Sequence, residues 1–418
     1  MGQDAIPGTA GLAIARPAAA WRPALGRALR AAVLTRLGIW AAGVWAVALW
    51  GTAGGAWRYD PAGVTRPYGR LGDALVAPLA RWDSVWYLAI AHDGYPAQDP
   101  QRPAFFPLYP ALVHAAGAVL GSPLVAGALL SAACAIAAFV LLARLTELEL
   151  GPQAARWALW ALALFPASFF LGAVYSEALF LALSIGAVYA ARTARWPWAG
   201  ALAALAGGTR SAGVLLVVPL ALLWWSARPR RARDAPWLLG APAGLAAFCA
   251  WLALRGGSAS APFHAQDLWF RHFAGPFVGV WDGAVAAWDG ARQLLSGSRA
   301  HVYFTHAGGD PFVAAGHDLL LFAFLLLALP ALWWTFRRLP AAYGAYSLAA
   351  LALPLSWPVA PQPLMSLPRF ELVLFPLFMA GGAWLADGGM RRRAVVLGAF
   401  AVGLAVLTAQ FATWHWVA

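Results

Sequence analysis

Apolar runs of about 15 to 20 residues recur along the chain, separated by short clusters of arginine and acidic residues. Runs of this length with few internal charges are typical of helices that cross a lipid bilayer. The first run, residues 31–49, follows four arginines within residues 1–30, so it predicts a span that starts in the cytoplasm. No convincing small-residue cleavage site follows it, which favours a retained span over a signal peptide.

Later runs predict spans at 123–142, 158–174, 178–191, 236–254, 318–334, 341–357, 370–385 and 394–412. Arginines flank the stretch 196–225 at both ends, so both ends are expected on the cytoplasmic side. This favours two short helices hinged at 207–211 over one helix with Arg210 buried at its middle. The run 108–120 is short enough to lie at the surface or to enter only part way. We therefore expect an all-α bundle of about 11 spans, residues 31–418, as one transmembrane domain behind a cytoplasmic tail, residues 1–30.

Two long polar and aromatic segments, residues 51–105 and 256–316, are predicted to be extracytoplasmic loops. Arginine clusters occupy the other connections and mark the cytoplasmic side. The acids and histidines that lie in apolar surroundings fall on or near the outer face in this topology. That asymmetry predicts a reaction site beneath the external loops, in the cell membrane, reached by its substrate from the bilayer.

Composition supports a membrane protein and weakens other classes. The chain is 62% hydrophobic and 11% charged, whereas soluble chains carry roughly 25% charged residues. The net charge of +12 could suggest nucleic acid, but the arginines are scattered between apolar runs, so no nucleic-acid partner is expected. Cys134 and Cys249 lie inside apolar segments, so neither a disulfide framework nor a thiolate metal site is supported.

Residues 81–110 concentrate acids, His, Arg and aromatics in a chain that otherwise avoids charge. In a helix, Trp86 and Tyr87 would lie on the side of Asp83, at i+3 and i+4. A carboxylate can remove the proton of a sugar hydroxyl, and arginine suits a phosphate leaving group because its guanidinium stays protonated and donates in a plane. Aromatic rings suit sugar faces and a lipid boundary alike.

Six segments, in order, resemble the GPI second-mannose (alpha-1,6) transferases and their bacterial relatives, which are GT-C class integral-membrane glycosyltransferases. The segments are WDSVWYLAIAHDGY, AFFPLYP, FPASFFLGAVYSEALFLALSIGAVYAAR, ALAGGTRSAGVLL, PFHAQDLWF and LPRFELVLFPLFM. The resemblance covers residues 75–385. It implies an inverting transfer of mannose from a polyprenyl-phosphate donor to a lipid or glycan acceptor, on the extracytoplasmic side, without a cofactor.

Carried over to this chain, the resemblance implies that Asp83 is the general base and that Glu177 orients the acceptor or supports Asp83. It implies that Arg210 and Arg369 bind the donor phosphate. The residues expected to contact substrate are Trp82, Trp86, Tyr87, Asp93, His264 and Arg271. The spacing of His and Asp supports no metal site, although a divalent ion could assist, and a monomer is expected.

Simpler interpretations remain open for the same residues. Asp83 could be an interfacial acid, Asp93 beside Gly94 could close a turn, and Glu177 could occupy the first turn of a capped helix. Arg210 could extend its side chain to the membrane surface. A lipid or solute transporter and a non-catalytic relative that binds polyprenyl lipids are the alternative functions.

Overall fold

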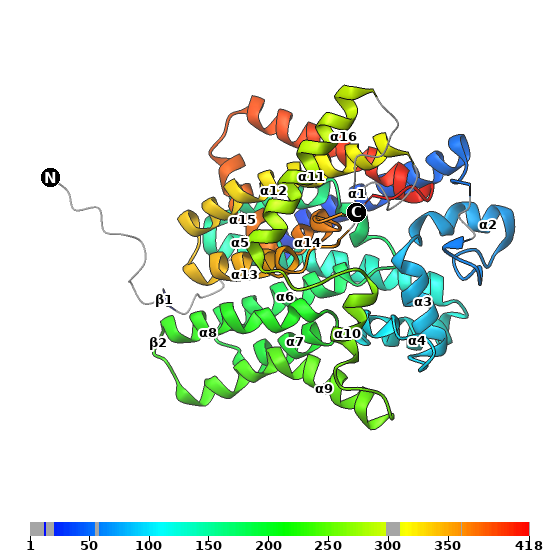
Figure 1. Cartoon of the computed structure of the whole chain (residues 1–418). Helices are drawn as coiled ribbons and strands as arrows, with labels where there is room; N and C mark the ends of the chain where they lie inside the picture. The colour runs from blue at the N-terminus through cyan, green and yellow to red at the C-terminus, as the bar shows by residue number, and fades with distance from the viewer. Residues whose placement is uncertain (1–11, 14–20, 55–57, 298–309, 361, 418) are drawn as a thin grey trace.

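The computed structural model describes residues 12–13, 21–54, 58–297, 310–360 and 362–417, which form a bundle of helices (Figure 1). The predicted all-α class is confirmed. The described strands are a parallel pair of two residues each, β1 (Leu12–Ala13) and β2 (Ala227–Arg228). Among the described residues, five helical segments are long and apolar enough to cross a membrane: α1 (Trp21–Trp50), α5 (Pro123–Leu164), η6 with α9 (Ala232–Leu254), α12 (Pro311–Arg338) and α16 (Met390–Ala412). The number of about 11 spans stays a prediction.

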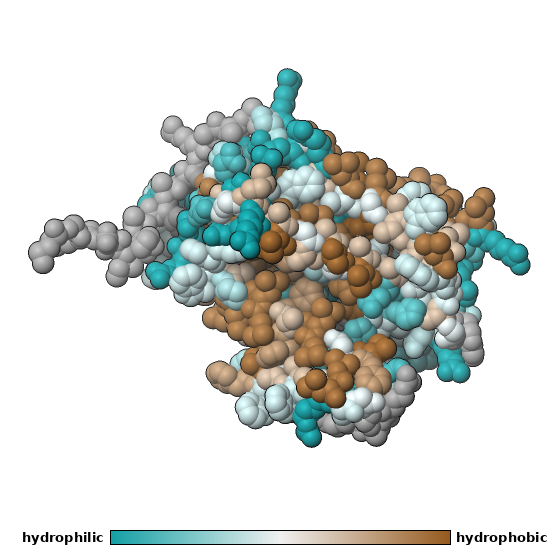
Figure 2. All heavy atoms as spheres, turned by 90° about the horizontal axis from the view of Figure 1, so that it is seen from above, coloured by the Kyte–Doolittle hydropathy of each residue, from teal (hydrophilic) through white to brown (hydrophobic). Residues whose placement is uncertain are grey.

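The predicted outer segment and one of the arginine clusters lie at opposite ends of the molecule. In Figure 1, α2 (Gly69–Val76), α3 (Asp83–Asp93) and α4 (Leu108–Leu120) lie at the right, and β2 lies at the left. Apolar side chains gather across the middle of the face in Figure 2, with hydrophilic ones mostly toward its edges. A hydrophobic middle between polar ends is the arrangement that a bilayer requires.

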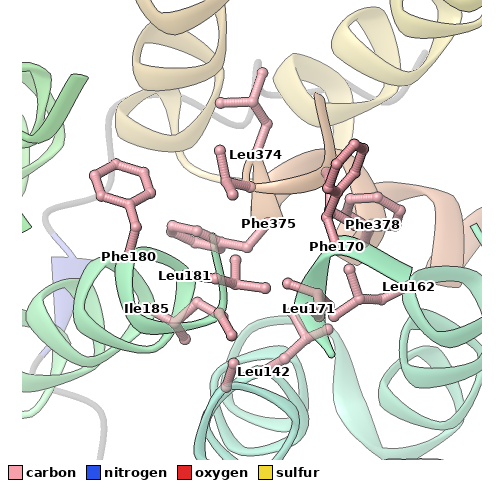
Figure 3. Close-up of a cluster of buried hydrophobic side chains, with 14 of the residues drawn as sticks. Leu142, Leu162, Phe170, Leu171, Phe180, Leu181, Ile185, Leu374, Phe375 and Phe378 are labelled. Carbon is pink, nitrogen blue, oxygen red and sulfur yellow. The ribbon is translucent and has the colours of Figure 1, made fainter. Parts of the chain in front are cut away.

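Helix α5 is broken at Gly151, whose φ of +85° is left-handed and is followed by Pro152. Leu142 and Leu162 lie on either side of this break, yet both belong to the buried cluster in Figure 3. A straight helix would separate them by about 30 Å. The chain therefore turns back at Gly151, which agrees with the prediction of separate spans at 123–142 and from residue 158 onward.

The predicted span 158–174 is too long. The helix ends at Leu164, before Phe165 and Pro166, because a proline disfavours the helical conformation of the residue before it. A 3₁₀ turn, η4 (Ser168–Leu171), and bends follow, and α6 (Glu177–Arg192) then begins. The non-helical connection places Tyr175 in contact with Asp83 at the start of α3, with Glu177 two residues further along.

The predicted hinge in residues 196–225 is confirmed. Helix α7 (Trp196–Gly207) ends before Arg210, and η5 (Ser211–Leu216) leads into α8 (Val217–Ser226). Helix α7 packs closely on α9 (Gly240–Leu254) through glycines: a Cβ at Gly244 would lie 2.0 Å from the Ala204 carbonyl oxygen. Small residues at such contacts let two backbones approach.

The predicted external loop 256–316 contains regular structure that its composition concealed. It includes α10 (Ala261–Leu268) and the 21-residue α11 (Pro276–Ser296), which packs on α12 and on α13 (Ala341–Ser356). Residues 298–309 of this loop lie outside the described residues. The other predicted external loop, 51–105, likewise holds α2, η2 (Ala77–Leu79), α3 and η3 (Arg102–Ala104).

In the core, α5 packs against α6 and against α15 (Phe375–Ala386), which follows the short α14 (Leu367–Leu372). Figure 3 shows Phe180 and Leu181 of α6 facing Leu374 and Phe375. This packing holds the first residue of α6 beside α14. Those two elements carry Glu177 and Arg369.

Candidate active site

Asp83 is the first residue of α3. The preceding residue, Trp82, has a φ of +53°, a conformation that side chains other than glycine rarely adopt. Strain of this kind, about 1–3 kcal/mol, persists only where the surroundings enforce it, and it concentrates at functional sites. This strained residue directly precedes the first turn of α3.

Asp83, Glu177, Arg210 and Arg369 form one connected charge network. The Arg369 guanidinium donates to Oδ2 of Asp83 through one terminal nitrogen and to Oε1 of Glu177 through Nε. A terminal nitrogen of Arg210 donates to the same Glu177 oxygen at 2.6 Å. Two acids and two arginines from four separate segments therefore meet in one place.

Burial distinguishes the two acids. The side chain of Glu177 is 0% exposed, whereas that of Asp83 is 21% exposed. A fully buried carboxylate requires partners, and Glu177 has two guanidinium groups. Its Oε2 is buried and has no hydrogen-bond partner among the described residues. Asp83 is the acid that a substrate could reach directly.

Aromatic rings support both arginines. The guanidinium carbon of Arg369 lies 4.8 Å from the ring centre of Tyr175, and that of Arg210 lies 5.7 Å from Phe370. Cations over aromatic faces are attracted to the ring quadrupole. The rings thus hold the guanidinium groups in place while excluding water beneath them.

Arg271 adds a third cation without a carboxylate partner in the described structure. Its terminal nitrogens donate to the backbone carbonyls of Trp357 at 3.0 Å and Met365 at 3.2 Å, and its guanidinium lies 5.4 Å from Phe370. The pKa of Arg271 is lowered to about 10, mainly by burial and also by the nearby positive charge of Arg369. The guanidinium stays protonated at neutral pH, so the site holds three cations and two carboxylates.

The predicted aromatic residues at the start of α3 pack against residues of other segments. Trp82 packs edge-on against Trp416 at 5.0 Å, and Trp86 lies parallel to Phe105 at 5.8 Å. Tyr87 is buried and shares a hydrogen bond of 2.8 Å with Ser176. Burial raises the pKa of Tyr87 to about 12, so its hydroxyl stays neutral at physiological pH.

Two predicted substrate residues lie away from the network. Asp93 ends α3, about 15 Å from Asp83 along the helix axis, and pairs with His92 and Arg102 at the surface. The hydrogen bond from His92 is the main cause of the lowered pKa of Asp93. His264 is exposed on α10 and contacts Ser260. Their predicted contacts with substrate stay predictions.

Sequence reasoning missed three contributors to the site: Tyr175, Trp269 and the segment after α16. Tyr175 stands two residues before Glu177, and that proximity was the available signal. Trp269 packs edge-on against Trp86 at 5.5 Å, and Trp414 packs against Trp82. Within the described residues, no three His, Cys, Asp or Glu side chains gather into a group that could hold a metal ion.

The family model described as mannosyltransferase (PIG-V) matches residues 69–222. We refer to this matched stretch, residues 69–222, as the PIG-V segment. The PIG-V segment contains Asp83, Glu177 and Arg210, which are three of the four residues in the charge network. The fourth, Arg369, comes from outside it.

The chain is similar to GPI alpha-1,6-mannosyltransferase 2 of Cricetulus griseus and of Rattus norvegicus, each 38% identical over 161 residues. Each match covers 35% of this chain and 32% of the relative, so the chain spans about a third of the length of these relatives. Among solved structures, the archaeal oligosaccharyltransferase AglB from Archaeoglobus fulgidus, in complex with an inhibitory peptide and a dolichol-phosphate, is 15% identical. The structural match covers 74% of this chain and 47% of the AglB chain, with a TM-score of 0.38.

Proposed function

We propose that this chain is a membrane mannosyltransferase that moves a mannosyl residue from a polyprenyl-phosphate donor to an acceptor hydroxyl. The observation that carries the proposal is the charge network, in which Arg369 joins the partly open Asp83 to the buried Glu177. Three of the four network residues lie in the PIG-V segment, which supports mannose as the transferred sugar. The acceptor is a lipid or glycan hydroxyl.

Asp83 is the proposed general base. Its Oδ2 accepts a hydrogen bond from Arg369. Within the described part of the chain its Oδ1 makes no hydrogen bond, so this oxygen can take the proton of the acceptor hydroxyl. As Asp83 removes the hydroxyl proton, the acceptor oxygen bonds to the anomeric carbon. The bond from that carbon to the phosphate oxygen breaks, and polyprenyl phosphate leaves with the electron pair. A single displacement of this kind inverts the anomeric carbon, and water later takes the proton from Asp83.

Glu177 is proposed to support Asp83 rather than to touch the acceptor. Its carboxylate is buried and engaged by both arginines, which fixes Arg369 relative to Asp83. Removing such a partner from a buried pair leaves an uncompensated charge. Of the two roles expected for Glu177, the contacts favour support.

The donor phosphate is proposed to bind among Arg210, Arg271 and Arg369. Two of these guanidinium groups already neutralise carboxylates, and Arg271 bonds to backbone carbonyls instead. The surplus cation suits a phosphate whose negative charge grows as the sugar departs. A phosphate ester is already a good leaving group, so the proposed reaction needs neither an acid nor a bound cofactor.

The proposed site is extracytoplasmic, and the chain is a multi-pass protein of the cell membrane with a cytoplasmic N-terminus. Supporting this orientation, α3 lies at the end of the molecule away from the arginines beside β2 (Figure 1). The donor would enter from the bilayer, because its polyprenyl chain stays in lipid. We propose that the chain acts as a monomer.

The experiment follows sugar release from synthetic polyprenyl-phosphate mannose by membranes that contain the wild-type chain, with a cell-derived acceptor extract. Asp83→Asn keeps the size of the side chain and removes the base, so we expect a loss of at least 100-fold in turnover. Asp99→Asn is the control, because Asp99 lies in the same external loop and pairs with Arg102. Equal turnover by wild type and Asp83→Asn would reject the base. Failure of the wild type on every polyprenyl-phosphate sugar would favour the transporter or lipid-binding alternatives.

A further inference from the structure

We propose that Tyr175 is a positioning residue that holds both Asp83 and Arg369 in the geometry required for transfer, an inference that rests on the proposed function. Tyr175 is 1% exposed and lies behind the network rather than in the space open to substrate. It contacts Asp83 and Arg369 through different parts of its side chain. The hydroxyl serves Asp83, and the ring serves Arg369.

The hydroxyl secures the start of α3. It accepts a hydrogen bond from the backbone N–H of Asp83 at 3.0 Å and donates one to the carbonyl of Arg81 at 3.1 Å. In the described structure, Trp82 supplies no side-chain cap to this helix. The first N–H groups of a helix lack partners within it, so an external acceptor is needed. Tyr175 provides that acceptor for the residue that carries the proposed base.

The same two hydrogen bonds enclose a strained residue. Arg81 and Asp83 flank Trp82, which has a φ of +53° and immediately precedes the proposed base. Strained backbone persists when neighbouring contacts over-determine it. With the hydroxyl of Tyr175 bound on both sides of Trp82, relaxation of this turn would move Asp83. The position of the carboxylate therefore depends on a residue 92 positions away in the chain.

The ring secures the partner of Asp83. The Arg369 guanidinium carbon lies 4.8 Å from the centre of the Tyr175 ring, and this guanidinium donates to both Asp83 and Glu177. Phe170 and Phe411 lie 5.0 and 5.9 Å from the Tyr175 ring and hold it in place. Movement of this ring would therefore change the distance between Arg369 and both acids.

The test compares Tyr175→Phe with Tyr343→Phe. Tyr343 is an equally buried tyrosine whose hydroxyl donates to Glu149 at 2.7 Å, so both variants lose a buried hydroxyl and its hydrogen bonding. For Tyr175→Phe we expect kcat to fall about tenfold while KM for the donor stays within twofold, because misplacement of a catalytic group affects the chemical step. Amide hydrogen exchange at Asp83 and Ser84 should also quicken about tenfold. Tyr343→Phe should leave these values unchanged. Tyr175→Leu, which also removes the ring, should lower kcat further.

Two outcomes would overturn the inference: a Tyr175→Phe variant with wild-type kcat and exchange rates, or an equal loss of kcat in Tyr343→Phe. Thermal unfolding of the purified variants shows whether a loss of activity only follows a loss of folded protein. The exchange measurement needs no substrate. If the wild-type chain transfers no sugar, the proposed function fails, while exchange at Asp83 still decides whether Tyr175 holds the start of α3.

Discussion

Arg369 joins the two acids of the candidate site, because its guanidinium donates to Asp83 on one side and to Glu177 on the other. It is itself largely buried, with 12% of its side chain exposed. A planar group with several fixed donors can bridge two carboxylates in a way that a lysine ammonium cannot. Both the stability and the chemistry of the site should therefore depend on this side chain.

We predict that Arg369→Met destabilises the protein by about 3–5 kcal/mol, because Glu177 would lose one of its two partners while remaining buried. Thermal unfolding in detergent, followed by tryptophan fluorescence, measures this loss. The double variant Glu177→Gln/Arg369→Met should regain part of the lost stability, since Glu177→Gln removes the buried charge. Additive losses in the double variant would contradict the coupling of Glu177 and Arg369.

The four residues of the network could be predicted from the sequence, because each stands in a short motif that carries charge within apolar surroundings. Their pairing could not: Arg369 and Asp83 are separated by 286 positions, and nothing local relates them. The contributions of Tyr175 and Trp269 to the site could not be predicted for a different reason. Buried aromatic residues in an apolar chain look alike in sequence, whether they form the core or position a charged group.

At the scale of elements, helices were predicted well where apolar runs were long and poorly where prolines or glycines shaped them. Pro166 shortened one predicted span, and α11 was hidden by its glycines and polar residues. The hinge at 207–211 was recognised because an unpaired Arg210 in the bilayer is costly. The structure adds what holds the hinge, namely the close approach of α7 and α9.

We predict that Gly244→Ala disturbs the site from a distance. Its new Cβ would lie 2.0 Å from the Ala204 carbonyl oxygen and 2.5 Å from the Gly208 nitrogen, so the end of α7 must move just before Arg210. Overpacking of this kind costs about 1–3 kcal/mol. We expect a lower unfolding temperature and a higher KM for the donor, measured in detergent and in membranes respectively.

Gly398→Ala is the matched control for that prediction. Gly398 lies in α16, and a Cβ there would meet no described atom within 4 Å. Alanine should therefore be tolerated, with little change in stability or turnover. Equal effects of the two substitutions would show that the α7–α9 contact does not position Arg210.

At the scale of the whole molecule, the charge network of the candidate site lies at the end with α3. Clustered arginines occupy connections such as residues 228–233, and other ion pairs, such as Arg192 with Glu149, lie outside the site. Arg392 and Arg393 donate to the last carbonyls of α15, where cations also oppose the negative end of the helix dipole. The proposed orientation assigns the arginine-rich end to the cytoplasm, where positive connections remain during insertion.

This orientation predicts the labelling of single cysteines placed at the two ends, in a chain whose Cys134 and Cys249 are replaced by alanine. Gln98→Cys lies in the exposed loop after α3, and Ala232→Cys lies exposed in the arginine-rich connection. A membrane-impermeant maleimide should label Gln98→Cys in intact cells and Ala232→Cys only after permeabilisation, because the reagent cannot cross the bilayer. The reverse pattern would place Asp83 in the cytoplasm. The donor would then have to present its sugar on that side, and the extracytoplasmic reaction would be excluded even if Asp83→Asn abolished turnover.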